Sequence, residues 1–253
     1  MDYKNENTSD KIEGRNPVAE ALRSGRTIDK ILVQSGERHG SLIKIIAMAK
    51  EKRIVISYVE KAKLDRISRT GAHQGVIAYA AAKEYVTVND ILNIAATKGE
   101  KPFIVICDNI TDPHNLGSII RTSNAAGVHG VIISKHNSVG LTEVVNKSSA
   151  GAVEFTPVAK VANIARTVDE LKKNNIWVVG ADMDGRDTIY TYDFSGAVAI
   201  VVGNEGRGIS HLVKEKCDSL VRIPMKGEIS SLNASVAGAL MIYEAVRRRE
   251  NIK

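Results

Sequence analysis

The chain has 253 residues, 43% of them hydrophobic and 25% charged, which is the composition of a globular protein and excludes collagen-like, low-complexity and largely disordered chains. No apolar run approaches the ~20 residues that a membrane span needs, and the polar first stretch, MDYKNENTSDK, does not resemble a secretory signal. Lys and Arg (35) outnumber Asp and Glu (29), and this net charge of +6 suits either a polyanionic partner or a basic solvated surface.

The first third of the chain predicts a tail followed by a small alternating α/β domain. Residues 1–11 are polar and are expected to form a disordered tail. A helix is expected from Asn16, a residue suited to the N-cap, with Pro17 in its first turn and Gly25 at its end. Further strands are predicted at 30–34, 53–59 and 75–81, and further helices at 41–52 and 61–69. The first domain is therefore expected over residues 12–82.

A linker, residues 83–101, is expected next, with a short helix near 88–96 and an exit rich in Lys and Gly. The alternation then restarts in a second domain, residues 102–253. Strands are predicted at 103–108, 130–134, 176–182, 198–204 and 219–224, and helices at 115–126, 142–150, 163–174, 208–217 and 232–249. The strands are apolar and β-branched without polar alternation, which predicts an α/β fold with a parallel sheet covered by helices on both faces.

Three loops of the second domain follow predicted strands, where open parallel sheets bind ligands. They span residues 108–121, 203–210 and 223–235. The second loop, GNEGRGIS, has glycines in an order that matches neither the GxGxxG dinucleotide fingerprint nor a GxxxxGK[ST] phosphate loop. The pattern therefore supports neither a standard Rossmann nucleotide site nor a P-loop NTPase.

The first and third loops contain more polar side chains than helix capping requires. Asn115 is a candidate N-cap, whereas Arg121 lies among apolar residues and is expected to be half buried against an acid or a phosphate. The candidate acids are Asp108, Asp112 and Glu205. Four small polar residues precede the last helix, namely Ser230, Ser231, Asn233 and Ser235. Because one cap needs only one of them, some are expected to face a ligand.

Other constellations carry less information. The six histidines show no metal-ligand spacing, and no GxSxG elbow is present. Asp182 and Asp184 form a DxD pair that suits either Mg²⁺ in a phosphatase or a turn with Gly185. Cys107 and Cys217 are too few for a disulfide framework and are expected to be core residues, so the expected location is a reducing cytoplasm.

The three loops resemble the motifs of the SpoU/TrmH (SPOUT) family of RNA ribose 2′-O-methyltransferases. NITDPHNLGSIIRTSNAAG (109–127), IVVGNEGRGIS (200–210) and IPMKGEISSLNASVAGALMIYEAVR (223–247) match them in the family's order. EGRNPVAEAL (13–22) through HQGVIA (73–78) resembles the L30e-like substrate-binding domain of the RlmB-type branch, which methylates a guanosine of 23S rRNA. The resemblance covers nearly the whole chain from Ile12 onward.

The resemblance implies a trefoil-knotted catalytic domain that binds S-adenosyl-L-methionine without a metal and forms a homodimer through the knotted region. It implies 23S rRNA or a pre-ribosomal particle as partner, and no membrane. It assigns the cofactor pocket to Gly203, Ile223, Leu232 and Met225. It assigns the catalytic set to Asn115, Arg121, Glu205, Ser231 and Asn233.

The implied reaction is an in-line displacement, in which a ribose 2′-oxygen attacks a methyl group carried by a sulfonium. The family gives Arg121 the role of general base, although arginine is effectively always protonated. Either Arg121 loses its proton in a closed, desolvated site, or it clamps an RNA phosphate while the proton leaves by another route, and we favour the clamp. Asn115 is expected to position Arg121 or the ribose, and Glu205 to orient the guanidinium or a substrate hydroxyl.

Charge is consistent with RNA binding by the first domain. Residues 1–82 hold 15 basic and 10 acidic side chains, whereas residues 83–253 hold 20 and 19. Three alternatives stay open: methylation of a tRNA or another rRNA nucleoside, a catalytically inactive L30e-like RNA-binding protein, and a metal-dependent phosphoesterase built on the DxD pair.

Overall fold

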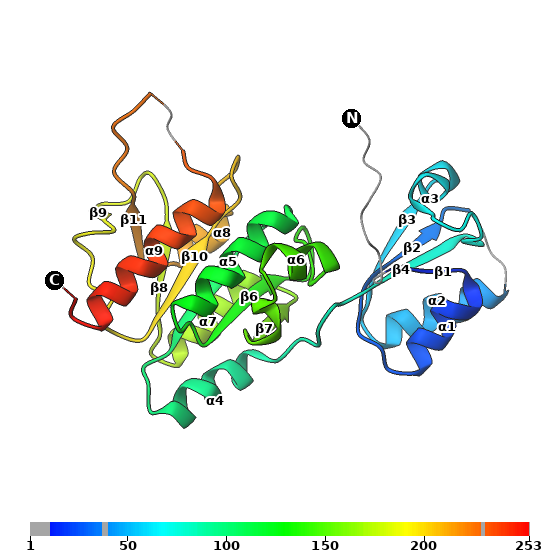
Figure 1. Cartoon of the computed structure of the whole chain (residues 1–253), viewed down its shortest axis with the longest axis horizontal. Helices are drawn as coiled ribbons and strands as arrows, with labels where there is room; N and C mark the ends of the chain where they lie inside the picture. Colours follow the sequence, from blue (N-terminus) through cyan, green and yellow to red (C-terminus); the bar gives the residue numbers. More distant parts are fainter. Residues whose placement is uncertain (1–10, 37–39, 229–230, 253) are drawn as a thin grey trace. The chain divides into compact units, whose positions relative to one another are not determined.

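The computed structural model describes residues 11–36, 40–228 and 231–252, and the chain forms two compact units (Figure 1). The first comprises Met1–Glu84 with the short segment Gly140–Glu143, and the second comprises Tyr85–Val139 and Val144–Lys253. Most of the expected tail lies outside the described residues. Its last residue, Lys11, already belongs to a strand, because it pairs with Tyr79 in an antiparallel ladder.

The first unit is a four-stranded sheet with helices on both faces. Its strands are β1 (Lys11–Glu13), β2 (Ile28–Gln34), β3 (Val55–Val59) and β4 (Val76–Ala80), in the order β1-β4-β2-β3. Only β2 and β3 are parallel. Its helices are α1 (Arg15–Arg23), α2 (Gly40–Glu51) and α3 (Lys61–Ile67). Val18 of α1 and Leu42 of α2 are buried in one core, while Leu64 of α3 packs with Ile77 in another.

The N-cap of helix α1 lies two residues earlier than expected. This cap is Gly14 rather than Asn16, which lies inside the helix. Strand β1 leads directly into α1, and the chain turns between them at Gly14 with a φ of 93°, a conformation that favours glycine. Pro17 lies in the first turn and Gly25, with a φ of 78°, follows the last turn, as expected.

The second unit confirms the predicted parallel sheet. Seven strands run in the order β7-β6-β5-β10-β8-β11-β9, and every pair is parallel. The strands are β5 (Phe103–Cys107), β6 (Gly130–Ser134), β7 (Val158–Val161), β8 (Trp177–Ala181), β9 (Asp187–Thr188), β10 (Val198–Val202) and β11 (Ser219–Arg222). The two edge strands, β7 and β9, were not predicted, because they are short and lack a continuous apolar run.

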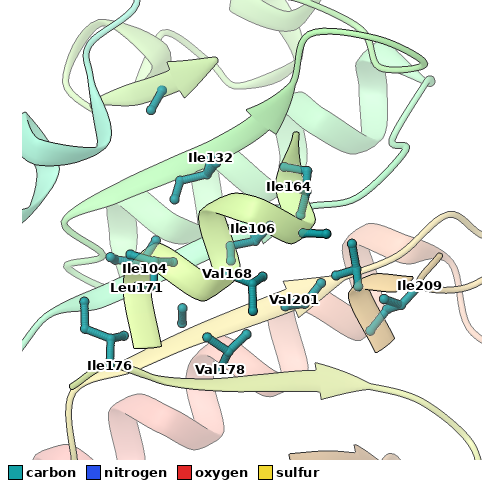
Figure 2. Close-up of a cluster of buried hydrophobic side chains, with 14 of the residues drawn as sticks. Ile104, Ile106, Ile132, Ile164, Val168, Leu171, Ile176, Val178, Val201 and Ile209 are labelled. Atoms are coloured by element: carbon teal, nitrogen blue, oxygen red, sulfur yellow. The ribbon is translucent and has the colours of Figure 1, made fainter. Parts of the chain in front are cut away.

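Helices cover both faces of this sheet. They are α4 (Val88–Lys98), α5 (Pro113–Ala125), α6 (Glu143–Ser148), α7 (Ile164–Lys173), α8 (His211–Lys216) and α9 (Ala234–Arg249), with a 3₁₀ turn at Ala152–Glu154. Figure 2 shows the core beneath α7, where Val168 and Leu171 meet strand residues such as Ile106. Helices α5 and α9 pack against each other (Figure 1), and α9 also packs on the sheet, where Gly238 lies against Val202 of β10. No helix in the described ranges combines the length and apolar character needed to cross a membrane.

The segment expected as a linker, residues 83–101, holds a helix that packs within the second unit. Thr87 and Asp90 form a capping box at the start of α4. Ile91 of α4 is fully buried in the core, where a Cβ on Gly130 would lie 2.5 Å from it. The helix is therefore a structural part of the second unit.

Candidate active site

Adjacent strands β5 and β10 bring the first two loops together. Cys107 and Val202 are paired at the carboxyl ends of these strands. Asp108, which is 3% exposed, accepts a hydrogen bond from the Ser210 backbone N–H at 2.7 Å (Oδ2) and one from Asn109 Nδ2 at 3.0 Å (Oδ1). Asp108 thus holds the second loop in place and is not a partner of Arg121.

The second loop closes on itself by backbone hydrogen bonds. The N–H of Asn204 donates to the Gly208 carbonyl at 3.0 Å, and the N–H of Gly208 donates to the Asn204 carbonyl at 2.8 Å. The Asn204 side chain accepts from the N–H of Gly206 at 3.0 Å. A Cβ on Gly203 would overlap the backbone of Gly208, so this position requires glycine. The closed loop carries Glu205.

Helix α5 brings Asn115 to this loop. The N-cap is Asp112, whose carboxylate accepts from the N–H groups of His114 (3.2 Å) and Asn115 (3.3 Å), so the cap suggested for Asn115 is wrong. Asn115 is instead a buried residue of the first turn, and its Nδ2 donates to Glu205 Oε1 at 2.8 Å.

Asn233 completes a cluster of three residues, one from each loop. It is the N-cap of α9, and its Oδ1 accepts from the N–H of Ser235 at 2.9 Å. Its Nδ2 donates to Glu205 Oε1, the same oxygen that Asn115 contacts. Two amides therefore orient the Glu205 carboxylate through Oε1, while Oε2 has no hydrogen-bond partner within the described residues. We call Asn115, Glu205 and Asn233 the Asn–Glu–Asn cluster.

Arg121 differs from its expected environment. Its side chain is exposed, and in the described part of the chain its guanidinium has no hydrogen bond or ion pair. Arg121 follows Asn115 by six residues, which is about 240° around an α-helix, so the two side chains leave α5 in different directions. The exposed guanidinium is available to an external anion.

A cavity of about 490 Å³ lies beside the cluster, and Glu205 and Ser231 contribute to its wall. Four further lining residues are those that the family resemblance assigned to the cofactor: Gly203, Ile223, Met225 and Leu232. Ser230, also singled out in the sequence, lies outside the described residues. The structure thus brings every expected site residue except Arg121 and Ser230 to the cavity or to the cluster beside it.

The DxD pair adopts the predicted turn, and it binds a cation of the chain itself. The N–H of Gly185 donates to the Asp182 carbonyl at 3.1 Å. Lys214 Nζ lies 2.8 Å from Asp182 Oδ1 and 3.0 Å from Asp184 Oδ2, and all three line the cavity. Sequence reasoning missed Lys214, because no spacing signal links it to a turn 30 residues earlier. Among the described residues no cluster of three His, Cys, Asp or Glu is suited to a metal ion.

Cys107 is a buried core residue, as predicted, and Cys217 is partly buried and packs against the core. Burial raises the pKa of the Cys107 thiol to about 12, and burial likewise raises the pKa of Cys217 to about 12. A nucleophilic thiolate is thus disfavoured at both positions at neutral pH.

Family models and curated relatives both match this chain to RNA methyltransferases. Residues 102–243 match the family model described as the SpoU rRNA Methylase family, and residues 11–86 match the model described as RNA 2′-O ribose methyltransferase substrate binding. The Bacillus subtilis protein YacO, named for the TrmH family of tRNA/rRNA methyltransferases, is 46% identical over 243 residues, which cover 96% of this chain and 97% of YacO. A Staphylococcus haemolyticus protein named for the same family is 45% identical over 241 residues, 95% of this chain and 96% of its own.

Two solved structures agree with these sequence matches. The SpoU methyltransferase AviRb from Streptomyces viridochromogenes, in complex with AdoMet, superposes with a TM-score of 0.61 at 26% identity, covering 95% of this chain and 90% of AviRb. An rRNA methyltransferase from Sinorhizobium meliloti superposes with a TM-score of 0.60 at 26% identity, covering 96% of this chain and 88% of its own.

Proposed function

Because the chain belongs to the SpoU rRNA methylase family, we propose that it transfers a methyl group from S-adenosylmethionine to the ribose 2′-hydroxyl of a guanosine in 23S rRNA. The observation that carries this proposal is the Asn–Glu–Asn cluster, which joins three distant loops beside a single cavity. The match of residues 11–86 to a 2′-O ribose methyltransferase substrate-binding model supports ribose as the target. The RlmB-type resemblance of the same region supports the guanosine of 23S rRNA.

The cavity fits the proposed methyl donor. Its volume of about 490 Å³ lies within the range of small-molecule sites. Apolar side chains, among them Val202, Ile223 and Leu232, offer a surface for a purine, while Gly203 lets the backbone approach closely. AviRb, which has the same fold, binds AdoMet. When bound, the donor supplies an electrophilic methyl group on a sulfonium whose leaving thioether is neutral.

Glu205 is the residue best suited to take the proton of the attacking hydroxyl. Asn115 and Asn233 hold its Oε1, which leaves Oε2 as an oriented acceptor. The hydroxyl becomes strongly acidic as its oxygen bonds to carbon, so a carboxylate is a sufficient acceptor at that moment. The 2′-O–H bond breaks toward Glu205 Oε2 while the C–S bonding pair stays with sulfur. A protonated guanidinium cannot accept this proton.

Arg121 then has the role of a phosphate clamp. Its exposed guanidinium has no partner among the described residues and is suited to bidentate binding of a phosphate. Residues 12–82 supply further RNA contacts in this proposal, because exposed Lys61, Lys63 and Arg66 lie along α3. Replacing these three by Gln is expected to weaken RNA binding and to flatten its dependence on salt, with donor affinity unchanged.

The protein acts in this proposal as a cytoplasmic homodimer whose catalytic domain, residues 102–253, is trefoil-knotted. An apolar groove of about 640 Å³ between α5 and α9 supports the dimer, because the exposed side chains of Val236, Leu240 and Tyr243 line it. Light scattering tests this part: the wild type is expected to have the mass of a dimer and Leu240→Arg that of a monomer.

Transfer of labelled methyl groups from S-adenosylmethionine onto total cellular RNA, followed by mapping of the labelled nucleotide, tests the function. We expect one 2′-O-methylguanosine in 23S rRNA, and no transfer by Glu205→Gln, which keeps the size of the side chain. Label in tRNA would favour the alternative substrate. RNA binding without any transfer by the wild type would favour an inactive RNA-binding protein.

A further inference from the structure

The cavity wall contains a polar cluster formed by Asp182, Asp184 and Lys214, in addition to the polar side chains of Asn204, Glu205, Arg207 and Ser231. Asp182 follows β8, and Lys214 lies on α8. In the sheet, β8 pairs with β10, the strand that precedes the Gly203 loop. Two separate elements thus bring a carboxylate and an ammonium to the same side of this cavity.

The turn from Asp182 to Gly185 is held against strand β11. The backbone N–H of Asp182 donates to the Val221 carbonyl at 2.9 Å, which extends the contact between β8 and β11 by one residue. A Cβ on Gly185 would lie 2.6 Å from the Val221 carbonyl carbon, so the turn packs directly on the β11 backbone. The Asp182 side chain is only 14% exposed. A rigid, mostly buried carboxylate at a cavity wall is preorganised for a ligand.

Each member of the pair keeps unused hydrogen-bonding capacity. Asp182 Oδ1 accepts from Lys214 Nζ (2.8 Å) and from the Asp184 N–H (2.9 Å), whereas Oδ2 has no hydrogen bond in the described part of the chain. Lys214 donates to Asp182 and Asp184, and an ammonium has three donors. An open acceptor therefore lies next to an open donor, which complements a vicinal diol, since each hydroxyl both donates and accepts.

We propose that Asp182, positioned by Lys214, binds the ribose diol of the methyl donor. This inference rests on the proposed function, and it assigns a cofactor contact to residues outside the three family motifs. A neutral diol adds to the Asp182–Lys214 ion pair without breaking it, whereas a charged amino-acid group must compete with that pair for each partner. Met183, which is 60% exposed on the same turn, offers a polarizable side chain to the adjoining purine.

Calorimetry with the full-length protein tests the assignment. Two probes are used: S-adenosylmethionine, and 5′-methylthioadenosine, which keeps the ribose and lacks the amino-acid group. We expect Asp182→Asn to weaken both at least tenfold, and Lys214→Gln to weaken both as well. Asp169→Asn is the matched control. Asp169 of α7 pairs at 2.6 Å with Lys216 of α8, the helix that also carries Lys214, and Asp169 does not line the cavity.

Each outcome is decisive. Equal affinity of wild type and Asp182→Asn for both probes overturns the proposal, as does a loss confined to S-adenosylmethionine, which would place the pair at the amino-acid group. An equal loss in Asp169→Asn would also overturn the proposal, because the loss of affinity would then come from a less stable α8 and not from a contact with the donor. If thermal unfolding shows that Asp182→Asn is not folded, Lys214→Gln decides alone. A wild type that binds neither probe would instead refute the proposed function.

Discussion

Glu13 stabilises the first unit through a carboxylate that binds one loop by several hydrogen bonds. Its Oε2 accepts from the hydroxyls of Ser68 and Thr70, each at 2.7 Å, and its Oε1 accepts from the Arg69 N–H at 2.8 Å. The loop links α3 to β4, and Glu13 ends β1, so the contact joins the edge strand to the rest of the unit. Replacing Glu13 by Gln removes the charge and turns an NH₂ group toward these donors.

Glu13→Gln is expected to lower the free energy of unfolding of the first unit by about 1–2 kcal/mol. Burial by itself raises the pKa of Glu13, but hydrogen bonds from Thr70, Arg69 and Ser68 outweigh it and lower the pKa from 4.5 to about 2. At 1.36 kcal/mol per pH unit this shift corresponds to ~3.4 kcal/mol. The side chain is partly exposed, and solvent screening reduces that figure to roughly half or less.

The pH dependence follows from the sign of the shift. Because the folded state has the lower pKa, the stabilisation is fully present above pH 4.5 and is lost as the pH falls toward about 2. Amide hydrogen exchange of β1 and β4 peptides in the full-length protein measures it locally. We expect Glu13→Gln to exchange about 5–30 times faster than wild type at pH 7, with the difference shrinking by pH 3. Glu20→Gln, at an exposed carboxylate on α1, is the control. The same difference at pH 3 as at pH 7 would refute the electrostatic explanation.

Three further changes probe the second unit. Gly203→Ala should weaken binding of S-adenosylmethionine more than tenfold, because its Cβ overlaps the facing backbone, whereas Gly196→Ala, which has open space around it and does not line the cavity, should bind normally in calorimetry. Arg121→Ala should abolish methyl transfer and leave donor affinity within a few-fold of wild type; substantial residual transfer would contradict the clamp. His129 accepts the Phe103 N–H at 3.0 Å through Nδ1, and burial lowers its pKa. Neutral His129 therefore stabilises the folded state above about pH 6.5, and this stabilisation is lost as the pH falls. In urea unfolding, the free energy of unfolding should fall more steeply with decreasing pH for wild type than for His129→Gln. Equal falls would contradict a stabilising hydrogen bond between Phe103 and His129.

Local sequence patterns predicted most elements of the fold. Runs such as FIVIC and VAIVV have no polar alternation, so they specify strands buried on both faces, and the structure places them side by side as β5 and β10. Glycine and capping residues predicted most helix ends to within a few residues. Asn16 and Asn115 were wrongly favoured as caps, because Gly14 and Asp112 precede them and take that position. A cap depends on where the preceding strand or loop delivers the chain, which the residue type does not encode.

The sequence by itself determined the family, the α/β alternation and the glycine-rich loop, because all three follow from short-range sterics, burial pattern and motif spacing. Only the tertiary structure decided which polar groups meet. Glu205 contacts Asn115, 90 residues away, and Asn233, 28 residues away, while Arg121 on the same helix as Asn115 is exposed. The pairing of Asp182 with Lys214 was likewise invisible in the sequence. These contacts depend on the strand order β5-β10-β8-β11, which long-range packing of the whole sheet determines.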